Sequence, residues 1–238
     1  MPPPTRSLEV AGVEAVGAYT LLRLRDDGGE NGAPGQFFML RAEPVPADAY
    51  LPRAVSAAWA GEGELAFLLD VRGPGTRALS AAGTVSVLGP LGHGFDLAPG
   101  PSILVGGGIG AAILPWLRRR LASSGEVRTV LGFRSEAHAV CAGLVDPEAT
   151  VVLDPVLVTE PLARLLPADA TVYACGPDRM LEAVAALCAE HDVPCQLAME
   201  AAMACGFGAC YGCAVRIDGT WKRLCIEGPV VEAGRVLA

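Results

Sequence analysis

Four of the eight cysteines in this 238-residue chain have a spacing that can bind an iron–sulfur cluster. In the segment ACGFGACYGCAVRIDGTWKRLC, three cysteines form a C-x4-C-x2-C motif, and a fourth follows after eleven residues. This spacing is used by four-thiolate 2Fe-2S sites. The glycines between the ligands allow the backbone to curl closely round a cluster and to point N–H groups at its sulfurs. The predicted ligands are Cys205, Cys210, Cys213 and Cys225.

A structural zinc site is the alternative for these four thiols. Such sites usually contain two C-x2-C pairs, whereas only Cys210 and Cys213 form one here. We therefore favour a 2Fe-2S cluster over zinc and over unligated thiols. Cys141, Cys188 and Cys195 lie in apolar sequence, where a small buried side chain is the ordinary interpretation.

Two turns beyond residue 100 have the composition of nucleotide-binding turns. The first, VGGGIGAA, follows the apolar run ILV and opens a helical stretch, so its backbone N–H groups can meet phosphate. The second, ACGPDRML, closes another βα unit, and both turns should lie at the carboxyl edge of one parallel sheet. Tight helix packing alone would explain either turn. The side chain of Cys175 in the second turn either faces a cofactor or is simply buried.

Two short motifs near the N-terminus suit a pyrophosphate. PRAVS supplies Arg53 and Ser56, and RGPGTRAL supplies Gly75 and Thr76. A guanidinium fork and a hydroxyl beside free N–H groups are groups that bind phosphate oxygens. Taken alone, an arginine such as Arg53 is more often a solvated surface charge.

The elements that must position these residues form three parts. Residues 1–99 alternate short β-like runs with Gly/Pro turns, among them DDGGENGAPG, which predicts an antiparallel barrel or sandwich. Residues 100–198 alternate apolar strands with helices, as in βα units on a parallel sheet. Residues 199–238 are rich in Cys and Gly, are too few for a core of their own, and end in a hairpin around RIDGTWKRL.

Composition excludes several classes of partner. A formal charge of −8 leaves no basic surface for nucleic acid or an anionic membrane. No apolar run reaches the roughly 18 residues that cross a bilayer, and the N-terminus lacks the apolar core of a signal peptide. We therefore expect no nucleic acid, no membrane and a cytoplasmic location.

The motifs and their order along the chain resemble the ferredoxin-reductase superfamily. They are PGQF, RxxS, GxGT, GPLGHGF, VGGGIG, CGP and MACGFGACYGC with KRLCIEGPV. Within it they resemble the electron-transfer subunits of NAD-dependent dihydroorotate dehydrogenases, over nearly the whole chain. The resemblance implies an N-terminal antiparallel FAD-binding β-barrel, a parallel-sheet nucleotide-binding domain and a small C-terminal 2Fe-2S module. It also implies an FMN-containing catalytic partner that oxidises dihydroorotate in pyrimidine biosynthesis, in a heterotetramer, with electrons running through the cluster to FAD and then to NAD.

Carried over to this sequence, the resemblance gives a set of cofactor-binding residues. They are Arg53, Ala54, Val55, Ser56, Leu68, Leu69, Asp70, Gly75 and Thr76 for FAD, with Gly107, Gly108, Gly110, Cys175, Gly176 and Pro177 in the nucleotide domain. No acid, base or nucleophile is needed for hydride and electron transfer, so no catalytic side chain is predicted. His93, in GPLGHGF, is either a turn residue or a group close to the flavin or partner.

Three positions depart from the family pattern. Ala54 replaces a proline of the motif RPxS, and Asp70 stands where a basic residue is common. The acidic DGSxGxxG stretch that helps shape the nicotinamide site is absent, and LDPVLVTEPL stands in its place. We therefore expect FAD and the cluster to be kept, and the final acceptor to differ from NAD or NAD to bind weakly.

Two other functions stay open from sequence alone. One is the equivalent subunit of another flavin complex, of the ferredoxin:NADP or sulfide-oxidising type. The other is a non-redox assembly protein with a zinc-stabilised docking module.

Overall fold

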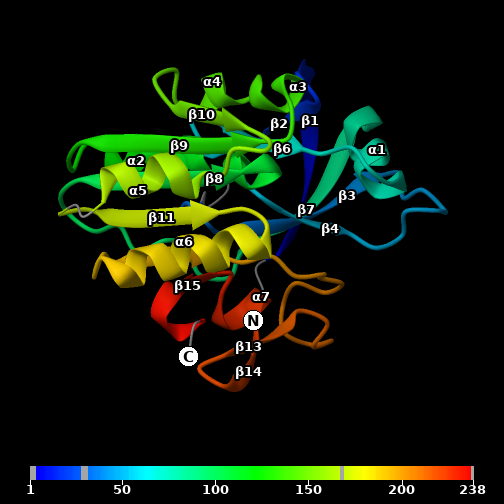
Figure 1. The fold of residues 1–238 in the computed structure, drawn as a ribbon. Helices are drawn as coiled ribbons and strands as arrows, with labels where there is room; N and C mark the ends of the chain where they lie inside the picture. The colour runs from blue at the N-terminus through cyan, green and yellow to red at the C-terminus, as the bar shows by residue number, and fades with distance from the viewer. Residues whose placement is uncertain (1–3, 28–31, 167–168, 237–238) are drawn as a thin grey trace.

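The computed structural model describes residues 4–27, 32–166 and 169–236, and contains two large sheets and one small one (Figure 1). Outside the described residues lie the two ends of the predicted domains, at residues 1 and 238, and part of the turn DDGGENGAPG. Among the described residues, no helix is long and apolar enough to cross a membrane.

The N-terminal part is a seven-stranded antiparallel sheet with the order β4-β3-β7-β1-β2-β6-β5. One face packs on a single core that includes Leu22, Phe38, Phe67 and Val85 from four different strands. Because strands far apart in the sheet contact the same core, the sheet curves into a half-barrel. Its elements are β1 (Thr5–Val16), β2 (Tyr19–Arg25), β3 (Phe37–Glu43), β4 (Arg53–Ser56), β5 (Trp59–Gly61), β6 (Glu64–Leu69), α1 (Pro74–Ala81) and β7 (Thr84–Leu91).

The second part is a six-stranded sheet with the order β10-β9-β8-β11-β12-β15. The first five strands are parallel, and helices cover the sheet, with α6 packed against β11 and β12. Their elements are β8 (Ser102–Gly107), η1 (Gly108–Ile113), α2 (Leu114–Leu121), β9 (Val127–Phe133), α3 (Glu136–Ala139), α4 (Ala142–Val145), β10 (Thr150–Leu153), α5 (Thr159–Leu165), β11 (Thr171–Cys175), α6 (Asp178–Glu190) and β12 (Cys195–Ala198).

The C-terminal part contains a Cys/Gly-rich loop, the predicted hairpin and a return to the large sheet. Its elements are β13 (Ala214–Ile217), β14 (Thr220–Arg223), α7 (Leu224–Glu227), β15 (Val230–Glu232) and η2 (Ala233–Arg235). β15 pairs antiparallel with β12, so the chain after the hairpin closes the edge of the parallel sheet. Figure 1 shows this part in orange and red below the other two.

The predicted architecture of a barrel, a parallel-sheet domain and a small C-terminal module is confirmed. The antiparallel β15 at the edge was not predicted. The domain limits 1–99, 100–198 and 199–238 remain a proposal, which the separate half-barrel core supports and the return of β15 complicates.

Candidate functional site

A cavity of about 250 Å³ lies between the half-barrel and the parallel sheet. Side chains from the ends of β4 and β6 form one wall, and residues after β12 form the other. The lining includes the predicted FAD residues Ala54, Val55, Ser56, Leu68, Leu69, Asp70 and Thr76, together with Gly110 and Cys175. The structure therefore gathers at one cavity motifs that are far apart in the sequence.

Arg53 and Gly75 lie outside this lining but in contact with each other. A Cβ built on Gly75 would lie 2.5 Å from Cζ of Arg53, so any larger residue would displace the guanidinium. The hydroxyl of Thr76 accepts the N–H of Arg72 at 3.1 Å and donates to the carbonyl of Gly73 at 3.2 Å, which fixes the first turn of α1. An arginine fork at the start of an eight-residue helix fits the pyrophosphate of FAD.

The departure at Asp70 is matched by a neighbouring cation. Arg72 forms an ion pair with Asp70, with Nη2 at 2.5 Å and Nε at 2.6 Å from the same carboxylate oxygen. Asp70 lines the smaller cavity, and Arg72 lines a larger one beside it. The basic group is therefore present two residues later and points toward the second cavity.

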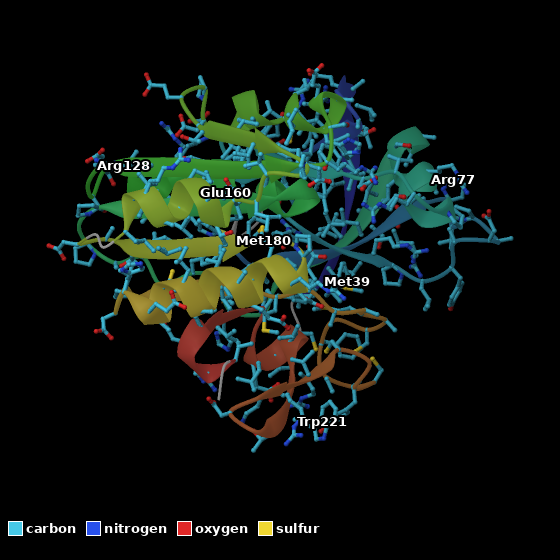
Figure 2. The ribbon with its side chains drawn as sticks, in the orientation of Figure 1. Met39, Arg77, Arg128, Glu160, Met180 and Trp221 are labelled. Carbon is cyan, nitrogen blue, oxygen red and sulfur yellow. The ribbon has the colours of Figure 1, made fainter. Side chains whose placement is uncertain are left out.

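The second cavity, of about 690 Å³, lies at the carboxyl edge of the parallel sheet. Its lining contains Gly107, Gly108, Gly110, Gly176 and Pro177, all of which are predicted nucleotide-binding residues. Two glycines are sterically required in this turn. A Cβ on Gly110 would lie 2.5 Å from the carbonyl oxygen of Cys175, and a Cβ on Gly107 would collide with Sδ of Met180, which Figure 2 labels.

The segment that replaces the acidic glycine-rich loop also lines the second cavity. Asp154 is held beside the end of β9, because its N–H donates to the carbonyl of Phe133 at 3.0 Å. Val156 and Leu157 are exposed at the rim. The replacement segment therefore leaves a cavity of dinucleotide size open at the sheet edge.

Three residues, Ile109, Gly110 and Glu200, line both cavities. Glu200 lies two residues after the end of β12 and is exposed. Partial desolvation raises the pKa of Glu200, the nearby Asp178 raises it further, and Arg72 partly offsets both effects. The two cavities therefore meet at one carboxylate, which places their occupants next to each other.

Several lining residues were missed by sequence reasoning. Tyr19 reaches the second cavity from the half-barrel, and burial raises its pKa to about 12. His138 packs edge-on against Tyr19 and bonds to Arg134. Nothing in the sequence around Tyr19 marks it, because its role depends on how the two parts dock. The position of Glu200 between a buried strand and the cysteine run was a signal that could have been used.

The cysteine loop has a left-handed backbone at two of its glycines. Gly206 and Gly208 have φ of +77° and +83°. A Cβ on Gly206 would lie 2.5 Å from Cγ of Met39 in β3, so the loop rests directly on the half-barrel (Figure 2). Arg223 supports the loop from the other side, since it donates to the carbonyl of Gly208 at 3.2 Å and lies 5.0 Å from the ring centre of Tyr211.

Backbone N–H groups point at the cysteine sulfurs, as predicted. Burial raises the pKa of Cys205, but hydrogen bonds from the N–H groups of Phe207, Cys210 and Ala209, together with one from the Cys210 thiol, lower it by more, to about 7. The N–H of Gly212 lies 3.5 Å from Sγ of Cys210. A loop that directs several donors at thiolates stabilises the negative charge of a thiolate-bound cluster.

The four thiols contact one another in pairs. Cys205 hydrogen-bonds to Cys210, and Cys213 to Cys225. Within the described parts of the chain, no three Cys, His, Asp or Glu side chains close round a single metal position. Two pairs of thiols fit the two irons of a 2Fe-2S cluster, with two thiolates on each, better than they fit one tetrahedral zinc. The ligand assignment remains a proposal.

The other predicted positions lie away from the cluster loop. Cys141, Cys175, Cys188 and Cys195 are all buried, as expected for three of them. Cys175 is buried, as one interpretation predicts, and it also lines the first cavity, so its proximity to a cofactor stays a prediction. His93 pairs with Pro229 through its backbone and does not line either cavity.

Solved structures with this fold are redox proteins. The chain superposes on an NADH-dependent reduced ferredoxin-NADP oxidoreductase with a TM-score of 0.80, at 23% identity over 96% of this chain and 88% of that one. The ferredoxin reductase of carbazole 1,9a-dioxygenase gives 0.64, at 25% identity over 80% of this chain and 67% of that one. The fold and the two adjoining cavities place the chain in the ferredoxin-reductase fold class.

Closer relatives identify the family. A protein of Caldanaerobacter subterraneus, the electron transfer subunit of dihydroorotate dehydrogenase B (NAD(+)), is 34% identical over 88% of this chain and 89% of its own length. The equivalent subunit of Desulforamulus reducens is 37% identical over 86% of each chain. Residues 200–237 match the iron–sulfur cluster binding domain of dihydroorotate dehydrogenase B. This chain belongs to the family of dihydroorotate dehydrogenase B electron transfer subunits.

The family confirms the resemblance that the motifs indicated, and with it the class of electron-transferring oxidoreductase subunit. The predicted FAD and 2Fe-2S cluster agree with the family, and so does NAD. An electron transfer subunit implies a separate catalytic subunit as its partner. The zinc-stabilised assembly protein is not supported.

Proposed function

We propose that this chain carries electrons from a dihydroorotate-oxidising, FMN-containing subunit through a 2Fe-2S cluster to FAD and then to NAD. One observation carries the proposal beyond family membership. Met203 lines the smaller cavity and Cys205, the first cluster ligand, follows two residues later. At its other side the same cavity adjoins the larger one through Glu200. The three cofactor positions therefore follow one another in the order of the relay.

FAD exchanges two-electron and one-electron chemistry when bound, and the chain holds and orients it. Arg53 and the first turn of α1 bind its pyrophosphate, and Gly75 leaves room for the guanidinium. Leu68 and Leu69, which are almost fully buried, provide an apolar wall that keeps water out. Ala54 retains the strand pairing of β4, since it still lies opposite Met39 in β3.

The charges around the larger cavity favour NAD(H) over NADP(H). The guanidinium groups of Arg134 and Arg179 line it and form no ion pair among the described residues. Arg72, the third cation, is neutralised by Asp70. Two available positive charges match the two phosphates of NAD, and the carboxylates of Asp154 and Glu200 oppose an additional 2′-phosphate. NAD binding therefore does not require the absent acidic loop.

The partner docks on the cluster module in this proposal. Four large apolar side chains of the module are exposed, and we call them the apolar rim: Phe207, Tyr211, Trp221 and Ile226. Trp221 projects at the lower edge of Figure 2 with 71% of its surface exposed. Exposed aromatic side chains next to a redox group are typical anchors of a protein interface. The complex is proposed to be a cytoplasmic heterotetramer of two subunits of each kind.

An anaerobic reduction experiment tests the relay. The chain is co-purified with its catalytic subunit, and dihydroorotate is added without NAD. The flavin and cluster absorbance of this chain should both be bleached, and addition of NAD should restore them with release of NADH. A Cys210→Ser variant should bind the partner and FAD but leave the FAD oxidised, whereas Cys141→Ser, a buried thiol outside the site, should behave as the wild type. Full FAD reduction in the Cys210→Ser complex would contradict the relay.

A further inference from the structure

Outside the redox site, two thiols that line neither of the two cavities described above face each other in the core. Cys188 is in the last turn of α6, on the buried stripe with Leu181, Val184 and Ala185. Cys195 is the first residue of β12. Their side chains hydrogen-bond to each other, with Cys195 as donor to Cys188, and exposed fractions of 1% and 5% show that both are enclosed.

The backbone between the two cysteines fixes their positions. The carbonyl of Cys188 accepts the N–H of His191 at 3.2 Å and of Val193 at 2.9 Å. Asp192 has φ of +54°, which closes the reverse turn. Cys195 is held in the sheet opposite Val172 of β11, and the carbonyl of the preceding Pro194 accepts the N–H of Val172 at 2.8 Å. A tight turn and a sheet therefore bring the thiols together in the reduced fold.

We propose that Cys188 and Cys195 are a buried modification site that forms a reversible intramolecular disulfide with hydroperoxides. The Cys188 thiolate attacks the O–O bond and takes one oxygen as sulfenic acid, releasing water from hydrogen peroxide or an alcohol from an organic peroxide. The Cys195 thiol then attacks that sulfur and displaces a second water. Two thiols lose two hydrogens and two electrons, and the peroxide is reduced.

The direction of attack and the class of oxidant follow from the surroundings. The hydrogen bond from Cys195 lowers the pKa of Cys188 and more than offsets its burial, while the same contact raises the pKa of Cys195. Cys188 is therefore the first nucleophile. Both side chains are too enclosed to meet a bulky disulfide such as oxidised glutathione, so a small hydroperoxide is the class of oxidant proposed.

The disulfide would link two elements whose opposite ends form the site. α6 begins next to Pro177 and carries Met180 at the larger cavity, and β12 leads to Ala198 and Glu200. Linking their remote ends should raise the melting temperature of the protein, because it restricts the unfolded chain. The inference does not depend on the proposed function.

Peptide mapping of the intact holoprotein tests the site. Dilute hydrogen peroxide is applied, free thiols are alkylated under denaturing conditions, and the chain is cut after glutamate. Glu190 lies between the two cysteines, so the disulfide links the peptides 183–190 and 191–200, and cleavage at Glu200 separates both from the cluster cysteines. We expect the linked pair, lighter by about 2 Da than the two free peptides and split by dithiothreitol.

Cys141 is the matched control, since it is a buried thiol without a thiol partner and burial raises its pKa to about 12. It should stay alkylatable at doses that link the pair. The Cys188→Ala and Cys195→Ala variants should keep NADH oxidation and lose the peroxide-induced rise in melting temperature. Recovery of both cysteines as alkylated peptides at doses that already modify Cys141, or linkage of either to a cluster cysteine, would overturn the proposal.

Discussion

Replacement of Gly75 by alanine should lower the affinity for FAD without unfolding the protein. The added Cβ would lie 2.5 Å from Cζ and 2.6 Å from Nη2 of Arg53, so the guanidinium must move. That group is the free end of a flexible side chain, and its movement costs the fold little. It does, however, take the guanidinium away from the start of α1, where the pyrophosphate is proposed to bind.

The magnitude follows from the interaction that is lost. A hydrogen bond to a charged group contributes about 1.5–3 kcal/mol. Loss of the Arg53–pyrophosphate interaction should therefore weaken FAD binding by about 10- to 150-fold. Titration of flavin-free protein with FAD, followed by quenching of flavin fluorescence, measures the dissociation constant, and thermal unfolding without FAD checks that stability is kept.

A matched variant controls for the glycine change itself. A Cβ added to Gly83 would meet no atom within 4 Å, and Gly83 follows the same helix without a left-handed backbone, so Gly83→Ala should bind FAD as the wild type does. Arg53→Lys should resemble Gly75→Ala, because lysine lacks the bidentate fork. Wild-type affinity in Gly75→Ala would refute the assignment of Arg53 to the pyrophosphate.

Three further predictions concern other parts of the chain. Arg134→Ala should raise the KM for NADH about tenfold at unchanged kcat, because one phosphate contact is lost. Arg128→Ala, at the opposite end of β9, should leave the KM unchanged. An equal KM in the two variants would contradict the assignment of Arg134 to a phosphate. Trp221→Glu should weaken binding of the catalytic subunit by about 30-fold or more, as measured by calorimetry. The variant should still reduce an artificial electron acceptor with NADH. Binding at wild-type affinity would exclude the apolar rim as the docking surface. Burial alone would raise the pKa of Asp146, but hydrogen bonds from Thr129 and Arg118 lower it below its ordinary value. The stability that ionised Asp146 contributes is therefore complete above about pH 4 and is lost as the pH falls. The denaturant midpoint of Asp146→Asn should fall less than that of the wild type between about pH 5 and pH 3, and parallel plots of midpoint against pH would refute this.

The glycine and cysteine motifs could be predicted from sequence because their function depends on local backbone geometry. Gly206 and Gly208 are needed for a left-handed backbone, and Gly110 is needed because its Cβ would meet the carbonyl of Cys175. Such constraints act on consecutive residues and leave a recognisable spacing. The same is true of the β-like alternation in the first 99 residues and of the βα units that follow.

Contacts between distant segments could not be predicted in this way. Tyr19 lines the nucleotide cavity only because the β1–β2 turn docks on α3, where the N–H of Ala18 donates to the carbonyl of Ala137 at 2.8 Å. Cys188 and Cys195 face each other only because a reverse turn folds α6 back onto the sheet. In each case the sequence around the residue has an ordinary composition, and only the tertiary structure shows which residues it contacts.

The departure at Asp70 shows how a change that looks unfavourable in the sequence acquires a meaning in the structure. With a basic residue at that position the smaller cavity would carry a cation, but Asp70 and Glu200 are the charged residues that line it here, and Arg72 faces the larger cavity. Asp70 and Arg72 neutralise each other in one ion pair, so Glu200 is the charge beside the smaller cavity that has no ion-pair partner among the described residues, and it opposes additional electron density on a flavin there. A flavin held beside this carboxylate would give up electrons more readily. The ion pair between positions 70 and 72 therefore adds no net charge to either cavity, and the proposed direction of the relay depends on Glu200 and on the two available cations of the larger cavity, Arg134 and Arg179.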